Sequence, residues 1–342
     1  MSTSSWPGLV DLQVNGFRGY DVNADDITTD TLVALTQELW REGVTSYLPT
    51  VITASEDKIL HALEVIAAAR RSDALIAHSI AGIHVEGPYL SPEDGPRGAH
   101  DAAHLRDPSI VELDRWQAAA EGLVRIVTLA PERMGALSYI AEAADRGVLA
   151  SIGHCAPTAE TVRTAVTAGA TLSTHLGNGT QSLLPRHPNH LWAQLAADDL
   201  TAMFIADGHH LPADALTAMI RAKGTDRAIL TSDSAALAGA TPGTYRTPVG
   251  GHVVVEGSGR LSLPGTALLA GSGHSLRACA EWALQHLPFG TDELIRMASH
   301  NPRRLLAHRQ DSEPDGDRID VHLGDELIIQ RVRVAGAVVH QR

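Results

Sequence analysis

Four residues with the chemistry of metal-dependent hydrolases, Glu86, His154, His175 and Asp233, stand out along the chain. Each stands at or just after the end of a short apolar run, and the runs are residues 80–87, 150–154, 171–176 and 228–234. Two imidazoles and a carboxylate suit a borderline divalent cation, and three protein ligands leave one coordination position open for water. Asp233 remains as a carboxylate that can act as a general base. The set predicts metal-assisted hydrolysis.

Gln13 and Asn15 alternate along the first extended run, so their side chains should share one face at the mouth of the fold. Amides bind zinc-like ions less well than imidazoles do, which favours one metal ion over a pair. We interpret both amides as groups that orient water or a bound ligand, with hydrogen bonding inside the core as the alternative. We therefore expect one divalent ion per chain, with Zn²⁺ as the first choice and Fe²⁺, Mn²⁺ or Co²⁺ suited to the same ligands.

Other polar residues near the ends of apolar runs are candidates for supporting roles. His84 shares a face with Glu86, and we interpret it as a buried donor to that carboxylate, with a role as a further ligand as the alternative. Asp207 and His210 follow the seventh run, where a histidine can donate to a carbonyl or hydroxyl group. Arg186 offers the planar fork that suits phosphate or carboxylate, although a lone loop arginine can equally be a solvated surface charge.

The order of apolar runs and helical patterns predicts the fold. Eight extended runs alternate with mostly helical segments, and they cover residues 8–15, 45–52, 80–87, 124–131, 150–154, 171–176, 201–208 and 228–234. The runs are largely apolar, as expected of parallel strands that are buried on both faces. We therefore expect an α/β fold of the (β/α)8 TIM-barrel type, in which the active site gathers at the carboxyl ends of the strands.

Composition changes divide the chain into predicted regions. The barrel is expected to cover residues 7–310, with a β-hairpin insertion near 240–274, where Gly257–Gly259 lies between two alternating runs. Residues 88–123 are rich in Pro, Gly and charge at their start and are expected to form a 3₁₀-like or irregular excursion over the site. Residues 311–342 are expected to form a polar linker and short strands, a reduced C-terminal β subdomain.

Composition also excludes several classes of function. The formal net charge of −13 argues against a nucleic-acid or anionic-membrane partner, because those partners need a basic surface. No apolar stretch reaches the roughly 20 residues of a membrane-spanning helix. Cys155 and Cys279 are too few for a disulfide framework and indicate a reducing compartment, with Cys155 expected in the packed core. We expect a cytoplasmic protein with a small-molecule substrate.

Ordered motifs along nearly the whole chain resemble those of N-acetylglucosamine-6-phosphate deacetylases in the amidohydrolase superfamily. In sequence order these motifs are PGLVDLQVNG, TSYLPTVITAS, GIHVEGPYL, GAH, VTLAPE, GHCAPT, THLGNG, IADGHHL, SDSAALAG and LAGS. The resemblance runs from Pro7 to about residue 310. It implies a metal-dependent hydrolase of amino sugar metabolism that removes the acetyl group of N-acetylglucosamine 6-phosphate, and a homodimer with its interface near the distal end of the substrate.

The resemblance also implies roles for individual residues. Glu86, His154 and His175 would be the metal ligands, Asp233 would activate water and protonate the leaving amine, and His100 would help to polarise the acetyl carbonyl. Asn178 and Gly179 would hold the substrate, and Arg186 and His210 would contact its distal, phosphate-bearing part. Gln13 and Asn15 resemble the branch of the family with a single metal ion.

Three departures from the family pattern concern the substrate. HLGNGT replaces a motif with an aromatic residue, and Gly177 stands at the aromatic position, which is expected to reshape the pocket. The aspartate motif reads Ser-Asp-Ser at 232–234, and the chain begins almost at its first predicted barrel strand. A deacylase or cyclic-amide hydrolase for an unphosphorylated N-acyl substrate therefore stays open, as do a metal-binding sensor barrel without catalysis and a glycosidase.

Overall fold

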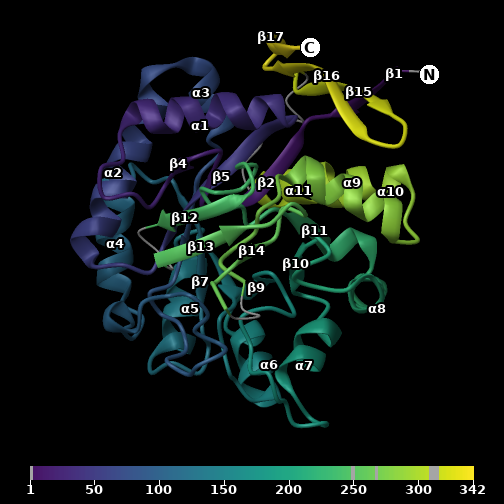
Figure 1. Ribbon diagram of the computed structural model, residues 1–342. Coiled ribbons are helices and arrows are strands. Elements are labelled where there is room, and N and C mark those ends of the chain that lie inside the picture. Colours follow the sequence, from purple (N-terminus) through teal and green to yellow (C-terminus); the bar gives the residue numbers. More distant parts are fainter. Residues whose placement is uncertain (1–2, 248–250, 266–268, 308–315) are drawn as a thin grey trace.

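Eight parallel strands form the centre of the molecule (Figure 1). The structure is a computed structural model that describes residues 3–247, 251–265, 269–307 and 316–342. The barrel strands are β2 (Leu9–Val14), β5 (Val44–Ile52), β6 (Ile83–Glu86), β7 (Val124–Leu129), β8 (Leu149–Ile152), β9 (Ala170–Ser173), β10 (Thr201–Ile205) and β11 (Ala228–Thr231). Each lies within, or within a residue of, one of the eight predicted runs.

The sheet closes on itself. Neighbouring strands pair in the order β11-β10-β9-β8-β7-β6-β5-β2, and every pair is parallel. The two end strands meet just past their carboxyl ends, through a parallel bridge between Val14 and Ser234. The backbone N–H groups of Asn15 and Gly16 donate to the Ser234 carbonyl at 2.9 and 3.1 Å. The predicted α/β TIM barrel is confirmed.

The amino-terminal half of the barrel is filled by an apolar cluster. Its buried members come from six strands, and they are Val10, Leu12, Leu48, Ile126, Leu172, Met203 and Ile229. Leu305 and Leu306 pack against this cluster. Interleaved branched and long side chains of this kind make a TIM barrel a packed core rather than a pore. The predicted ligands lie at the opposite end, where the strands finish.

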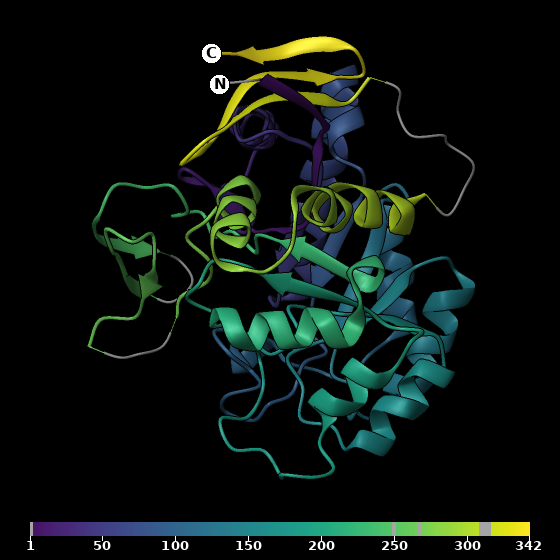
Figure 2. The same cartoon turned by 90° about the vertical axis from the view of Figure 1, so that its right-hand side faces the viewer.

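Helices surround the barrel (Figures 1 and 2). They are α1 (Thr29–Arg41), α2 (Glu56–Ser72), α3 (Ala74–Ser79), α4 (Ile110–Ala119), α5 (Ala136–Asp145), α6 (Ala159–Thr167), α7 (His190–Ala196), α8 (Ala213–Lys223), α9 (Leu276–His286), α10 (Thr291–Ile295) and α11 (Asn301–Leu306). A π-helical turn, Arg296–His300, joins the last two. Short 3₁₀ turns cover Ala102–His104 and Thr225–Arg227.

Segment 88–123 contains a 3₁₀ turn, as expected, but it also contains the helix α4, which was not predicted. Ser109 caps this helix by accepting a hydrogen bond from the backbone N–H of Glu112. Leu113 and Trp116, three residues apart, are both buried. The capping serine and this spacing are signals of a helix in the sequence. The Pro- and Gly-rich residues before them predict irregular structure, and this prediction was extended over the whole segment.

The insertion after β11 lies over the barrel mouth. It contains β12 (Gly243–Thr247), β13 (Gly251–Val255) and β14 (Leu261–Ser262), which form a three-stranded antiparallel sheet. The predicted hairpin turn at Gly257–Gly259 connects the last two strands. Residues 248–250 and 266–268 of the predicted insertion lie outside the described residues. Figure 2 shows this small sheet standing apart from the barrel wall.

A second antiparallel sheet contains both ends of the described chain. Its strand order is β1 (Thr3–Pro7), β15 (Arg318–Leu323), β16 (Leu327–Val334) and β17 (Ala337–Gln341). The chain was expected to begin almost at the first barrel strand, but β1 precedes that strand. Its short TSSWP run has little apolar pattern, so the sequence does not predict it. The proposed boundary between residues 310 and 311 lies outside the described residues.

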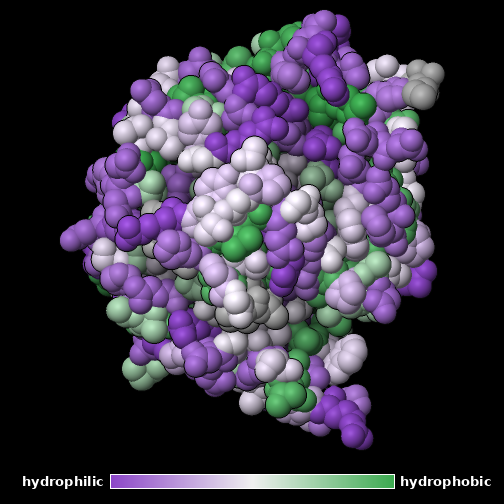
Figure 3. Space-filling model, in the orientation of Figure 1, coloured by the Kyte–Doolittle hydropathy of each residue, from purple (hydrophilic) through white to green (hydrophobic). Residues whose placement is uncertain are grey.

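The face of the molecule that Figure 3 shows is mostly polar. Hydrophilic residues dominate the face in Figure 3, and hydrophobic residues form small separate patches on it. Among the described residues, no helix is long and apolar enough to cross a membrane.

Candidate metal centre and active site

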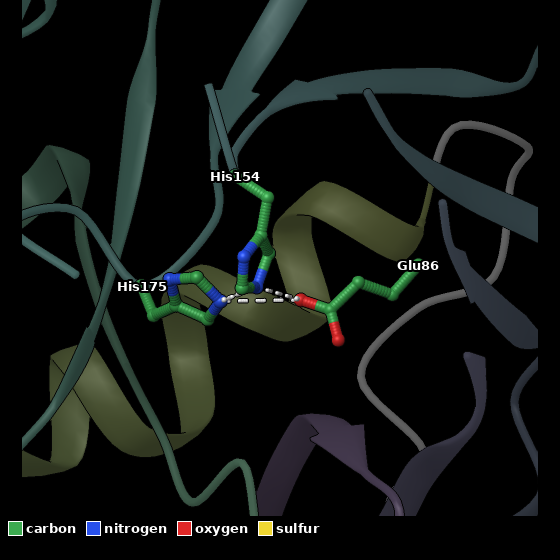
Figure 4. Close-up of side chains that lie close together, drawn as sticks. All are labelled: Glu86, His154 and His175. Atoms are coloured by element: carbon green, nitrogen blue, oxygen red, sulfur yellow. Dashed lines mark hydrogen bonds and ion pairs between the residues drawn. The ribbon is translucent and has the colours of Figure 1, made fainter. Parts of the chain in front are cut away.

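Three predicted ligands meet at the carboxyl ends of β6, β8 and β9. The side chains of Glu86, His154 and His175 point toward one another in Figure 4. Their donor atoms all lie within 4.8 Å of one another, and all three residues are buried. His175 Nε2 lies 3.1 Å from Glu86 Oε1 and 3.0 Å from His154 Nε2, and the distance from His154 Nε2 to Glu86 Oε1 is 3.4 Å. The structure thus brings together three predicted ligands that are far apart in the sequence.

The chemistry of this donor set fits a divalent cation. His154 Nδ1 donates to the Pro96 carbonyl at 2.8 Å, which leaves the Nε2 lone pair directed at the centre. Burial alone would lower the pKa of His154, but the hydrogen bond and charge of Glu86 raise it. Burial would raise the pKa of Glu86, and its hydrogen bonds to the two histidines hold that pKa well below its usual range. Converging nitrogen lone pairs and a buried carboxylate are the surroundings that such an ion needs.

The backbone at these residues is unusual. His154, His175 and Asp233 have φ angles of 48°, 28° and 49°, in the left-handed region that non-glycine residues rarely adopt. Such conformations cost about 1–3 kcal/mol each and concentrate at functional sites. Gly179 supports this geometry, because a Cβ at that position would lie only 2.8 Å from His154 Nδ1.

The two amides of the first strand each hold a carboxylate. Gln13 Nε2 donates to Glu86 Oε1 at 2.8 Å, and Asn15 Nδ2 donates to Asp233 Oδ1 at 2.8 Å. Burial and the nearby charge of Glu86 raise the pKa of Asp233 to about 6. The amides therefore orient a predicted ligand and the predicted base.

His84 is not a donor to Glu86, contrary to the sequence-based interpretation. Its Nδ1 lies 3.0 Å from the Leu12 carbonyl oxygen and its Nε2 lies 2.7 Å from Thr128 Oγ1. Thr174 Oγ1 continues this chain, 2.6 Å from Thr128 Oγ1 and 2.6 Å from Ser151 Oγ. Burial lowers the pKa of His84 to about 4, so the ring is neutral. Its role is to link strands beneath the site, and Gln13 takes the place expected for it.

His100 reaches the site from the long loop after β6. Its Nε2 lies 3.3 Å from His154 Nε2 and 3.9 Å from Glu86 Oε2. Burial and the neighbouring charge of His154 lower the pKa of His100 to about 3, which makes it a neutral imidazole. A neutral ring next to the donor set can donate one hydrogen bond to a bound carbonyl oxygen.

A single cavity of about 420 Å³ is lined by the donor set and by Asn15, His100 and Asp233. His210, Asn178 and Gly179 line it as well. Its outer wall comes partly from the insertion and is apolar, with side chains from Val253, Leu261, Leu269 and Ala270. The cavity is thus polar at the donor set and aliphatic toward the insertion.

Sequence reasoning missed two polar residues of the cavity. Asp21 and Asn23 line it next to β5, and the Asn23 side chain is held between the Thr50 carbonyl and the Ile52 backbone N–H at 3.0 and 2.9 Å. The signal for them was a polar pair after the glycine-containing turn that follows the first strand.

Comparison with known proteins places the chain among sugar-phosphate deacetylases. It is 36% identical over 303 residues to N-acetylglucosamine-6-phosphate deacetylase of Bacillus subtilis (strain 168), covering 88% of this chain and 74% of that protein. It is 35% identical over 300 residues to N-acetylgalactosamine-6-phosphate deacetylase of Escherichia coli O157:H7, covering 88% and 77%. No family model matches the chain. The chain belongs to the N-acetylglucosamine-6-phosphate deacetylase family.

A solved structure agrees with this membership. The family member from Mycobacterium smegmatis, a variant in complex with N-acetyl-D-glucosamine-6-phosphate, superposes with a TM-score of 0.86 at 30% sequence identity. The match covers 99% of this chain and 87% of that one. The (β/α)8 fold and the metal-dependent amidohydrolase class of this deacetylase-family chain follow from these likenesses.

Two positions at which the family pattern implies contact with the substrate lie outside the cavity lining of this deacetylase-family chain. Arg186 is exposed, and it is not among the described residues that line the cavity. Gly177 has a φ angle of 100°, and a Cβ there would lie 3.0 Å from Leu211 Cδ2 and 3.3 Å from Met219 Cε. Neither Leu211 nor Met219 lines the cavity.

Proposed function

We propose that this chain hydrolyses the acetamide of N-acetylglucosamine 6-phosphate to glucosamine 6-phosphate and acetate. The observation that carries the proposal is the meeting of the donor set Glu86, His154 and His175 with the carboxylate of Asp233 in one cavity. A binding protein would need the ligands but no base beside them. Family membership and a family structure in complex with the phosphorylated sugar support the choice of substrate.

The proposed roles follow from where each polar atom lies. An ion held by the donor set would polarise the acetyl carbonyl and lower the pKa of a water molecule toward neutrality. Asp233, held by Asn15, accepts the proton from water and delivers it to the departing nitrogen. The neutral ring of His100 donates a hydrogen bond to the carbonyl oxygen as charge develops there.

The sugar is proposed to lie against Asn178, Gly179 and His210, which line the same cavity. Asn178 lies next to the donor set, and its side-chain amide donates to the His175 carbonyl at 3.2 Å. Zn²⁺ is the proposed ion, and Fe²⁺, Mn²⁺ or Co²⁺ would suit the same three ligands.

N-acetylgalactosamine 6-phosphate is a second candidate substrate. The relative named for that sugar is 35% identical to this chain, against 36% for the one named for the glucosamine sugar. The two substrates share the acetamide and the phosphate and differ in the configuration of one hydroxyl group. The deacetylation chemistry proposed above is the same for both.

We also propose a cytoplasmic homodimer. Leu183 and Trp192 are 88% and 57% exposed, and both belong to the segment around Arg186. Apolar side chains with this degree of exposure suit burial against a second copy of this segment. Such a dimer would also allow Arg186 to contact a bound phosphate. Cys155 and Cys279 are buried free thiols, in keeping with a reducing compartment.

The test is acetate release by metal-reconstituted protein. We expect turnover of N-acetylglucosamine 6-phosphate, with kcat/KM about ten- to a hundredfold above that for N-acetylglucosamine, because charge-assisted hydrogen bonds to phosphate contribute roughly 1.5–3 kcal/mol. The kcat/KM for N-acetylgalactosamine 6-phosphate is measured in parallel, and the sugar with the higher kcat/KM is the preferred substrate. Turnover of N-acyl amino acids with no activity on any of the three sugars would refute the proposal.

A further inference from the structure

The barrel closes at a seam between β2 and β11 that lacks a backbone ladder. Every other pair of neighbouring barrel strands is joined by a ladder of paired residues. Among the described residues, the backbone pairing across the seam is one bridge from Val14 to Ser234, past the end of β11. Asp11, in the middle of β2, is fully buried. Side chains must therefore satisfy backbone groups at the seam that a ladder satisfies elsewhere in the barrel.

The carboxyl group of Asp11 spans this seam. Its Oδ1 accepts hydrogen bonds from Thr231 Oγ1 at 2.8 Å and from the Ser232 backbone N–H at 3.1 Å. The backbone N–H of Gln13, on the strand of Asp11 itself, lies 3.4 Å from the same oxygen. Asp11 thus binds β2 to the last residue of β11 and to the residue after it, directly before Asp233.

Both neighbours of Asp233 in the sequence are bound to the first strand or to the turn after it. Ser232 Oγ donates to the Gln13 carbonyl at 3.3 Å and accepts the Ser234 backbone N–H at 3.1 Å. Ser234 Oγ donates to the Gly16 carbonyl at 2.8 Å. Asp233 itself has the left-handed φ angle of 49°. A residue in this strained conformation persists only where its surroundings fix the backbone on both sides.

The seam also sets where the proposed base lies relative to the donor set. Asn15, on the β2 side, donates to Asp233 Oδ1 at 2.8 Å, and Gln13 donates to Glu86 Oε1 at 2.8 Å. The first strand therefore contacts both the base and a predicted metal ligand. Movement of β11 against β2 would displace Asp233 from both, and a displacement of about 1 Å can lower a rate about a hundredfold. Asp11 is not among the residues that line the cavity.

Only one oxygen of Asp11 takes part in these contacts. Among the described residues, Oδ2 is buried and has no hydrogen-bond partner. Burial raises the pKa of Asp11, although the bonds from Ser232, Thr231 and Gln13 oppose the rise. The contacts require an acceptor at the position of Oδ1, and a neutral side chain of the same shape can supply it.

We propose that Asp11 is a positioning residue for the proposed hydrolysis, and that its Oδ1 fixes the end of β11 against β2 so that the Asp233 carboxylate stays beside the donor set. The inference rests on the proposed function, because it assigns Asp11 a role through the base of that reaction. The acceptor oxygen of Asp11, rather than its charge, fulfils this role.

Two substitutions of Asp11 in the metal-reconstituted protein test the inference. Asp11→Ala removes the acceptor, so kcat for N-acetylglucosamine 6-phosphate should fall about ten- to a hundredfold, with KM changed by less than about threefold. Asp11→Asn retains an acceptor oxygen and should keep kcat within about threefold of the parent. The amount of bound metal should equal that of the parent in both. Parental kcat in Asp11→Ala, or equal losses in the two variants, would overturn the inference.

A double-mutant cycle distinguishes positioning of the base from general support of the fold. Because Asp11 is proposed to act through Asp233, adding Asp11→Ala to Asp233→Asn should lower kcat by less than about twofold further. Multiplying effects would overturn the inference. Asp317→Asn is the matched control, because Asp317 is a buried carboxylate near β15 that does not line the cavity. It should lower stability in urea unfolding and leave kcat at the parental value.

Thr231→Val keeps the inference testable if Asp11→Ala does not fold. It preserves the carboxyl group and the side-chain shape but removes one of the two donors from the β11 side, so kcat should fall about three- to tenfold. Parental kcat in this variant would overturn the inference.

Hydrogen exchange gives a readout that does not depend on activity. The Ser232 amide should exchange about tenfold or more faster in Asp11→Ala than in the parent, and within about threefold of the parent in Asp11→Asn. Unchanged exchange in Asp11→Ala would overturn the inference while leaving the proposed function intact. A folded, metal-loaded parent without deacetylase activity would contradict the proposed function and the inference with it.

Discussion

At the scale of single residues, the donor set depends on backbone conformation as much as on side-chain type. His154, His175 and Asp233 take left-handed φ angles just past their strands, and this turns their side chains over the barrel mouth. Residue types and strand ends predicted which side chains would meet. The backbone geometry could not be predicted, because the same residues in an extended conformation would alternate between the two faces of a strand.

The misinterpretation of His84 has a physical cause. Two residues before Glu86 on a four-residue strand, it shares a face with Glu86 but lies one layer deeper. At that depth its partners are Thr128 and a backbone carbonyl, and the amide of Gln13 lies closer to Glu86. The spacing of residues along one strand predicts the face of the sheet on which a side chain lies. The residue that this side chain contacts also depends on the stagger between neighbouring strands, which the sequence does not show.

Asp233→Asn is expected to separate catalysis from metal binding. The amide keeps the size of the side chain but cannot accept the proton, so kcat should fall by about 10²–10⁴-fold, the usual contribution of a positioned acid–base group. Metal content measured by mass spectrometry should stay at the parent level. A variant with parental turnover would mean that Asp233 has only a structural role.

At the scale of elements, strong periodic patterns were predictable and short ones were not. The barrel strands and the long helices α1 and α2 have apolar patterns that single-sequence reasoning detects. The strand β1 and the six-residue helix α3 depend on tertiary partners, because so few residues carry little periodic signal. The antiparallel pairing of β1 with β15 joins residues more than 300 positions apart, and no local pattern reveals it.

Asp317, just before β15, forms polar contacts with residues of the barrel helices. Its carboxylate lies 2.9 Å from His78 Nε2, 3.3 Å from Arg303 Nη1 and accepts the Ala335 backbone N–H at 2.9 Å. Burial would raise the pKa of Asp317, but the bond to His78 and the other partners lower it. A carboxylate with a depressed folded-state pKa adds stability above its unfolded pKa of about 3.9, and this stability is lost as the pH falls through the folded-state value.

Asp317→Asn is therefore expected to destabilise the protein at neutral pH. A loss of about 1–3 kcal/mol in the free energy of unfolding is expected at pH 7, because buried partners of a charged group are left unsatisfied. The difference from the parent should narrow as the pH falls below about 4. Urea unfolding at several pH values measures it, and a difference independent of pH would show that the charge of Asp317 is not what stabilises this junction.

At the scale of the whole molecule, the exposed apolar residues near Arg186 predict self-association. The parent should sediment at twice the 36.3 kDa mass of the chain, because burial of Leu183 and Trp192 against a second copy stabilises the pair. Trp192→Glu should shift the protein toward the single-chain mass in analytical ultracentrifugation. A monomeric parent at micromolar concentration contradicts the proposed dimer.

One metal ion held by Glu86, His154 and His175 is the central element of the proposed function. Stepwise addition of Zn²⁺ to metal-free protein, with acetate release from N-acetylglucosamine 6-phosphate measured at each step, tests this claim directly. We expect activity to rise in proportion to bound ion and to reach its maximum at one ion per chain, and His175→Ala to show neither tight binding nor activity while remaining folded. Full activity in metal-free protein, or a maximum reached only at two ions per chain, would contradict the account.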